Sequence, residues 1–198
     1  MGLRIGLFGG SFDPVHNAHV ALAREALSAL SLDEVRWIPA GRPWQKSVQM
    51  SDAGHREAMV KLAIAGQPGF VLDRCELERS GPSYTLDTVR ELQPRQPHAQ
   101  WFLLIGQDQY AGLHTWQDWQ ELLGRVVLAV ANRPGPSRPV DPEVLRFPHR
   151  TVPLAMLDIS STDIRRRVGA GLPIDHLVPP DVARYIEHQA LYRAANRN

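Results

Sequence analysis

The chain has 198 residues, of which 43% are hydrophobic, a composition typical of a globular protein. Its net charge of +1 excludes a general attraction for nucleic acid or acidic membranes, and its single cysteine, Cys75, excludes an intramolecular disulfide and a cysteine-based metal site. The N-terminal residues lack the layout of a signal peptide, and no run approaches the roughly 20 apolar residues of a membrane helix. We therefore expect a soluble protein of the cytoplasm.

Strand and helix patterns alternate in the first half of the chain. Short apolar runs predict strands at residues 3–8 and 34–40 and an extended segment at residues 70–77. Apolar residues at helical spacing predict helices at residues 19–32, 52–66 and 85–93.

The alternation continues in the second half, with strands predicted at residues 101–106 and 126–132 and a helix at 115–124. A proline-rich stretch, residues 132–144, predicts a surface loop, and the tail is helical from residue 159 onward. Strands that are apolar throughout are typical of a sheet covered on both faces, so the sequence predicts a doubly wound parallel α/β sheet. We expect one domain over residues 1–198, with a core at about 1–158 and a helical part at about 159–198.

The stretch "GGSFDPVHNAHV" lies between the first predicted strand and the first predicted helix. Gly9 and Gly10 allow a ligand to approach the backbone, and Ser11 adds a hydroxyl. His16 and His19 are spaced to share one face at a helix N-terminus, where backbone N–H groups favour an anion. The stretch therefore predicts a phosphate site, although each histidine alone is as well explained by the core or the surface. It is neither a G-x-G-x-x-G nor a Walker motif.

A second stretch, "ISSTDIRRRV", predicts a helix that begins at a cap, because Ser160 and Asp163 have the capping-box spacing. Ser161 and Thr162 supply more hydroxyls than one cap needs, and an arginine follows one turn later. Such a cluster is suited to binding phosphate. A helix start with a solvated arginine face explains the same residues.

A third stretch, "LLIGQDQYAGLHTWQDW", follows a buried strand with polar and aromatic residues. Asp108, close behind Gly106, is suited to accept a hydrogen bond from a ribose or a base, and Trp116 is suited to stack on a heterocycle. For Trp119, three residues later, we expect core packing.

Together these stretches resemble the nucleotidyltransferase superfamily with a Rossmann-like α/β core, whose H-x-G-H and ISSTxIR elements hold ATP. The segments "IPAGRPWQK", "ERSGPSYTLDT", "IGQDQ", "NRPG" and "VARYIEHQALY" follow, in order, the pattern of bacterial nicotinate-mononucleotide adenylyltransferases. The resemblance covers essentially the whole chain. Ala18 replaces the glycine of H-x-G-H, and Trp44 and Gln45 stand where the family more often has Pro-His.

The resemblance implies that the protein joins nicotinate mononucleotide to the adenylyl group of ATP and releases pyrophosphate, with Mg²⁺ bound through the ATP phosphates. It implies catalytic roles for His16, His19, Lys46 and Arg165. The implied ATP-binding residues are Gly9, Gly10, Ser11, Phe12, His16, His19, Gly106, Asp108, Ile159, Ser160, Ser161, Thr162 and Arg165. The implied nicotinate mononucleotide-binding residues are Lys46, Ser83, Tyr84, Thr85 and Trp116. No protein metal site, nucleic acid or membrane partner is implied.

Three other functions compete with this one. Related adenylyltransferases act on nicotinamide mononucleotide or on phosphopantetheine, but the phosphopantetheine enzymes do not match the "SGPSYT" and Trp116 segments. A non-catalytic nucleotide sensor is favoured only by Ala18. A nucleic-acid binder that uses "DIRRRV" is disfavoured by the near-zero net charge. The "SGPSYT" segment is also explained by a turn and a helix cap.

Overall fold

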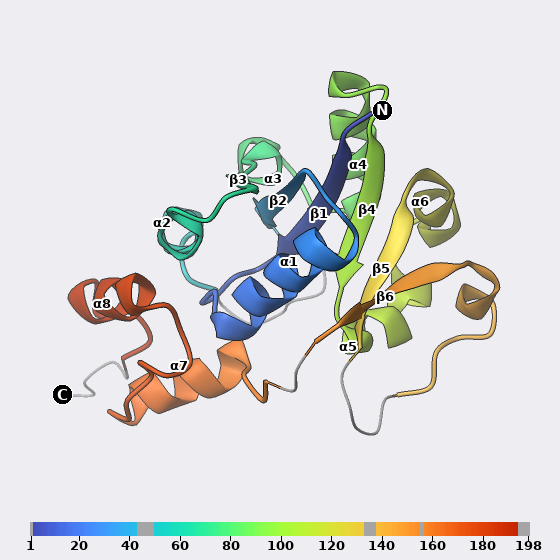
Figure 1. Cartoon of the computed structure of the whole chain (residues 1–198). Helices are drawn as coiled ribbons and strands as arrows, with labels where there is room; N and C mark the ends of the chain where they lie inside the picture. The colour runs from blue at the N-terminus through green and yellow to red at the C-terminus, as the bar shows by residue number, and fades with distance from the viewer. Residues whose placement is uncertain (1, 43–49, 133–137, 155–156, 194–198) are drawn as a thin grey trace.

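The computed structural model describes residues 2–42, 50–132, 138–154 and 157–193. Within these ranges, parallel strands form a six-stranded sheet with the order β3-β2-β1-β4-β5-β6 (Figure 1). The strands are β1 (Arg4–Gly10), β2 (Glu34–Pro39), β3 (Phe70–Leu72), β4 (Gln100–Ile105), β5 (Val127–Asn132) and β6 (His149–Pro153). The predicted Rossmann-like doubly wound sheet is confirmed.

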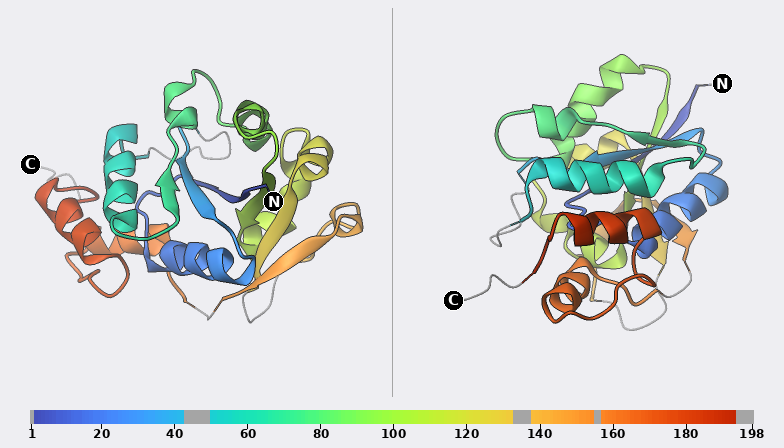
Figure 2. Two further views of the ribbon diagram at one scale, coloured as in Figure 1. Left: turned by 45° about the horizontal axis from the view of Figure 1, so that its top comes forward. Right: turned by 90° about the vertical axis from the view of Figure 1, so that its left-hand side faces the viewer.

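Both faces of the sheet are covered by helices, as the two views in Figure 2 show. The helices packed with one face are α1 (Asn17–Ala29), α2 (Ala53–Ile64), α7 (Ser161–Gly169) and α8 (Pro180–His188). Those packed with the other face are α3 (Cys75–Glu78), α4 (Thr85–Leu92), α5 (Gln107–Ala111) and α6 (Trp119–Arg125). Short 3₁₀ turns lie at Gln93–Arg95, Leu113–Thr115 and Val144–Arg146. Among the described residues no helix is long and apolar enough to cross a membrane.

The central strands are apolar throughout because side chains on alternate faces are both buried. In β4, Phe102 and Leu104 pack with α1, whereas Leu103 and Ile105 pack with α4 and α6. The C-terminal helices join the first of these two cores, through Ile164 of α7 and through residues of α8. The prediction that residues 1–198 form one domain, with a core at about 1–158 and a helical part at about 159–198, stays a prediction.

Four expectations about the elements were wrong in detail. Residues 70–77 are extended only to Leu72, because the Asp73 carboxylate accepts the N–H of Cys75 and starts α3. The helix expected at 115–124 begins only at Trp119, since Asp118 has the left-handed φ of 47°. The last helix ends at His188, although its pattern continues to residue 193. Neither α5 nor the edge strand β6 was expected.

The order of the strands places β1 and β4 side by side at the centre of the sheet, where the winding changes direction. The loops after these two strands therefore diverge to opposite faces and leave a crevice beyond the carboxyl ends of the strands. Gly9 and Gly10, the last two residues of β1, lie at this point.

Candidate active site

A cavity of about 440 Å³ lies beyond the carboxyl ends of β1, β2 and β4. It collects residues from all three stretches that the sequence singled out, and from the "SGPSYT" segment. The predicted site residues that line it are Gly9, Gly10, Ser11, His16, His19, Ser83, Thr85, Gly106, Asp108, Trp116, Ile159, Ser160 and Ser161. Segments as far apart in sequence as Gly9 and Ser161 thus share one cavity wall.

Two stacked imidazoles stand at the N-terminus of α1. His16 is the N-cap and is 6% exposed, and its ring lies 3.6 Å from that of His19, centroid to centroid. The His16 N–H donates to His19 Nδ1 at 3.1 Å. Because Nδ1 accepts, the neutral His19 ring carries its hydrogen on Nε2. His19 therefore offers a donor at a helix N-terminus, where an anion is already favoured.

Aromatic side chains pack against the histidine pair. Phe8 and Phe12 both contact the His19 ring, with centroids 5.9 Å and 5.2 Å away. Phe12 is 1% exposed and is not part of the cavity wall, so its side chain acts on the site through its contact with His19. Ala18 does line the cavity, which places its methyl group, where the family has glycine, against the space a ligand would occupy.

Helix α7 is joined to the β1–α1 loop by its side chains. Ser160 caps the helix by accepting the N–H of Asp163, as predicted, and Ser161 Oγ donates to the Pro14 carbonyl at 3.0 Å. Arg165 donates to the Asp13 carbonyl at 2.7 Å and to Thr162 Oγ1 at 3.3 Å. Arg165 and Thr162 thus stand beside the cavity, although they are not part of its wall.

The three consecutive arginines of α7 have different partners. Arg166 and Arg167 both hydrogen-bond Asp163, which lowers the pKa of that carboxyl. Arg165, the third, faces the β1–α1 loop. Of the three, Arg165 alone reaches this loop through a hydrogen bond within the described residues, because consecutive residues of a helix point about 100° apart.

The opposite end of the cavity is built around Ser83. Ser83 Oγ accepts the backbone N–H groups of Gly41 and Arg42 at 3.0 and 3.1 Å, so it joins the α3–α4 turn to the loop after β2. Tyr84 follows as the N-cap of α4 and is not part of the cavity wall, whereas Thr85, the first residue of the helix, is.

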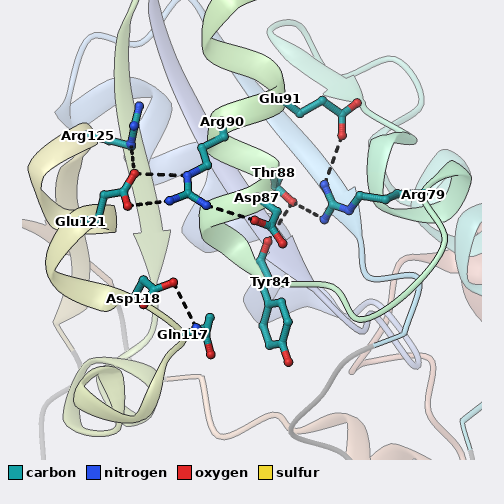
Figure 3. A network of polar contacts seen from close by, with 10 residues as sticks. All are labelled: Arg79, Tyr84, Asp87, Thr88, Arg90, Glu91, Gln117, Asp118, Glu121 and Arg125. Carbon is teal, nitrogen blue, oxygen red and sulfur yellow. Dashed lines mark hydrogen bonds and ion pairs between the residues drawn. The ribbon is translucent and has the colours of Figure 1, made fainter.

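A polar network ties α4 to its neighbours (Figure 3). Arg79 donates to Thr88 and pairs with Glu91, and Thr88 also reaches the Tyr84 carbonyl at 3.3 Å. Arg90 of α4 and Arg125 of α6 share Glu121. The network thereby ties α4 to α6, the helix that follows the segment carrying Trp116.

Sequence reasoning missed four polar residues of the cavity wall, Glu76, Thr88, Gln107 and Gln109. Glu76 is 7% exposed, and its carboxyl accepts the Thr88 hydroxyl at 2.6 Å and is also hydrogen-bonded to Ser83. Burial raises the pKa of Glu76, and these hydrogen bonds offset only part of the shift. The available signal for Glu76 was an acidic residue inside residues 70–77, which the sequence predicts to be extended.

It also missed Arg56, which is 1% exposed on α2. Its guanidinium donates to the carbonyls of Ser11 and Ala40 at 3.0 and 2.7 Å, and to those of Ser51 and Gly41. Arg56 therefore joins the loops that follow β1 and β2. The predicted residue Lys46 lies outside the described residues, as does Arg133 of the "NRPG" segment.

The described residues contain no group of three or more histidine, cysteine or carboxylate side chains arranged to hold a metal ion.

Comparison with known sequences gives one consistent result. The family described as cytidylyltransferase-like matches residues 7–167. A probable nicotinate-nucleotide adenylyltransferase of Methylibium petroleiphilum is 53% identical over 195 residues, a match that covers 96% of this chain and 92% of the relative. A relative of the same description from Bordetella pertussis is 47% identical over 196 residues, covering 96% of this chain and 98% of the relative.

Solved structures agree in fold. Plasmodium falciparum nicotinic acid mononucleotide adenylyltransferase complexed with NaAD has a TM-score of 0.80 at 20% identity, covering 96% of this chain and 97% of that one. The same parasite enzyme complexed with APC has a TM-score of 0.78 at 19% identity, with the same coverage. At these identities the likeness shows a shared fold.

Proposed function

The chain belongs to the nicotinate-nucleotide adenylyltransferases, within the cytidylyltransferase-like family, and we propose that the cavity beyond β1 and β4 is where it performs adenylyl transfer. In this reaction a phosphate oxygen of nicotinate mononucleotide attacks the α-phosphorus of ATP. The new P–O bond joins the two nucleotides as nicotinate adenine dinucleotide, and the bond to pyrophosphate breaks.

One observation carries the proposal: a single cavity has a phosphate-binding end and an aromatic end. The first holds the His16–His19 pair at the N-terminus of α1. The second holds Trp116 beside the N-terminus of α4. A mononucleotide carries its charge at the phosphate and its flat ring at the opposite end, so nicotinate mononucleotide fits this arrangement with its phosphate at the histidines and its ring at Trp116.

Adenylyl transfer depends more on the positioning of the two substrates than on proton transfer. A phosphate monoester carries between one and two negative charges near neutral pH, so the attacking oxygen needs no general base. Catalysis then depends on holding both substrates in line and on meeting the charge that grows on the transferred phosphoryl group. His19 Nε2–H is suited to the second task, with His16 stacked beside it.

We assign the remaining predicted residues by their place around the cavity. Arg165, with Ser160, Ser161 and Thr162, contacts the leaving pyrophosphate from α7, and Lys46 reaches phosphate from the loop after β2. The nucleotide backbone of ATP lies along Gly9, Gly10 and Ser11, while Phe12 acts through His19. Adenosine lies against the remaining ATP residues, Gly106, Asp108 and Ile159.

We also propose Mg²⁺ as the cation that accompanies ATP. When bound, it neutralises phosphate charge. Its ligands would be phosphate oxygens and water, consistent with the donor groups that the described residues bring to the cavity. The chain's own residues supply the remaining positive and hydrogen-bonding contacts.

For nicotinate mononucleotide we propose a carboxylate contact at the start of α4. Tyr84 and Thr85 lie at the N-terminus of α4, where backbone N–H groups and the helix dipole favour an anion. Donor-only N–H groups favour a carboxylate over an amide, whose NH₂ group would have no acceptor there. Ser83 supports this turn through Gly41 and Arg42, and Trp116 stacks on the pyridine.

Substitution of Trp116 by alanine tests this arrangement. The KM for nicotinate mononucleotide should rise roughly tenfold, since loss of aromatic stacking costs about 1–3 kcal/mol by comparison with bases on aromatic platforms. The KM for ATP should stay near its wild-type value. The matched control is Gln120→Ala, an exposed position on α6 outside the cavity wall. Equal increases in both KM values would contradict the assignment of Trp116 to the pyridine.

A further inference from the structure

Asp13 is a buried carboxylate that the proposed mechanism does not use. It lies in the β1–α1 loop between Ser11 and His16, is 2% exposed, and does not line the cavity. Its Oδ1 accepts the Tyr192 hydroxyl at 2.6 Å, and its Oδ2 accepts the Ser51 N–H at 3.1 Å. Burying a carboxylate this completely is costly unless hydrogen bonds or paired charges compensate for the lost water.

Tyr192 reaches Asp13 from the other end of the chain, 179 positions away. The segment after α8 turns back sharply, because Ala190 and Tyr192 have φ values of 50° and 62°, which are unfavourable for residues other than glycine. A turn back of this kind needs contacts that hold it, and the Tyr192–Asp13 bond is one of them. Burial raises the pKa of Tyr192, which keeps its hydroxyl a donor.

The same loop is held at three further points. Arg56 binds the Ser11 carbonyl, Arg165 binds the Asp13 carbonyl, and Ser161 binds the Pro14 carbonyl. These contacts come from α2 and α7, so Tyr192 is the contribution of the C-terminal segment. Two residues beyond Pro14 the chain reaches His16, and the path of the loop determines where the stacked histidines stand.

We propose that Tyr192 is a positioning residue for adenylyl transfer: through its hydrogen bond to the Asp13 carboxylate, the C-terminal segment sets the β1–α1 loop and thereby the place of His16 and His19. The inference rests on the proposed function of the cavity. It also gives a role to the "QALYR" sequence near the C-terminus, none of whose residues is among the proposed substrate contacts.

Tyr192→Phe removes the hydroxyl and keeps the ring, so the core contacts of the segment are retained. Turnover should fall on the order of tenfold to a hundredfold, the loss that a small displacement of positioned groups causes, with the KM values for ATP and nicotinate mononucleotide nearly unchanged. Amide hydrogen exchange over residues 11–19 should become faster. The matched control is Tyr185→Phe, which removes the hydroxyl that contacts His55 at 2.9 Å between α8 and α2; it should alter neither quantity.

Two results would overturn the inference. One is a Tyr192→Phe variant with wild-type kcat or with unchanged exchange over residues 11–19. The other is an equal loss in Tyr185→Phe, which would assign the effect to the packing of the C-terminal helix in general. The exchange comparison needs no turnover, so it tests the hold of Tyr192 on the β1–α1 loop separately from the proposed function, which an inactive wild-type protein would contradict.

Discussion

His19 is the side chain on which the chemistry of the proposed site depends most. Its Nδ1 is occupied by the His16 N–H, so Nε2 is the atom that can donate to the transferred phosphoryl group. His19→Ala should reduce kcat by roughly a hundredfold or more, the cost of losing one donor to the transition state. Thermal melting should show a folded variant, and His188→Ala, at the exposed end of α8, is the control. Near-normal turnover of His19→Ala would remove it from the catalytic residues.

The buried carboxyl of Glu76 leads to a prediction about how the free energy of unfolding depends on pH. Burial raises its pKa in the folded protein, so above the unfolded pKa the folded state retains a proton that the unfolded state has lost. The free energy of unfolding therefore decreases as pH rises through the window between the two pKa values. Glu76→Gln removes this loss while it keeps an oxygen that can accept from Thr88.

Urea denaturation of both proteins at about pH 4 and about pH 7 measures this effect. The stability of Glu76→Gln relative to wild type should be more favourable at the higher pH. A difference between the two proteins that is the same at both pH values would show that Glu76 titrates normally. Glu143→Gln, at an exposed position, is the control.

At the residue scale, the sequence indicated residues of the cavity wall where they belong to a short contiguous motif. Most of the residues that the sequence proposed line one cavity, because the glycines, histidines and hydroxyls lie at the ends of strands and the starts of helices. Arg56, Asp13 and Glu76 were missed because their roles depend on partners distant in sequence. A single arginine in an amphipathic helix looks like a surface residue until its contacts are known.

Among the elements, α2 has the clearest structural task, since its Arg56 binds the loops after β1 and β2. A lysine cannot reproduce the planar fork that serves several carbonyls at once. Arg56→Lys should lower the free energy of unfolding by about 2–4 kcal/mol, because buried carbonyls lose their donors. Urea denaturation measures this, with the exposed Arg95→Lys as control. If the free energy of unfolding fell no further than in the control, the loops after β1 and β2 would keep their conformation without the Arg56 guanidinium.

The errors at the element scale have physical causes. Strand β6 is an exposed edge strand, with only Val152 buried among its residues, so it lacks the apolar run that marks the central strands. Helices α3 and α5 span only four and five residues, too few for a helical repeat to be recognised. The central strands and the long helices were predictable because each buries a face large enough to impose a pattern.

For the molecule as a whole, the cavity is lined by residues from Leu7 to Ser161 and by elements on both faces of the sheet, so ligands should stabilise the entire fold. At a concentration of 100 times its Kd, a ligand adds about 2.7 kcal/mol to the free energy of unfolding. For a chain of this size that corresponds to an increase in Tm of roughly 5–10 °C. Tripolyphosphate is the control that lacks adenosine. If ATP at saturation left Tm unchanged, the cavity would not be its binding site.

The measurement that tests the central claim most directly is pyrophosphate release with ATP and Mg²⁺, with nicotinate mononucleotide, nicotinamide mononucleotide and phosphopantetheine offered as separate acceptors. Release that is far faster with nicotinate mononucleotide is the predicted result, and it would support the carboxylate contact at Tyr84 and Thr85. A preference for phosphopantetheine, or no release with any acceptor while ATP still binds, would contradict the proposed function; the second result would point to Ala18, whose methyl group lines the cavity.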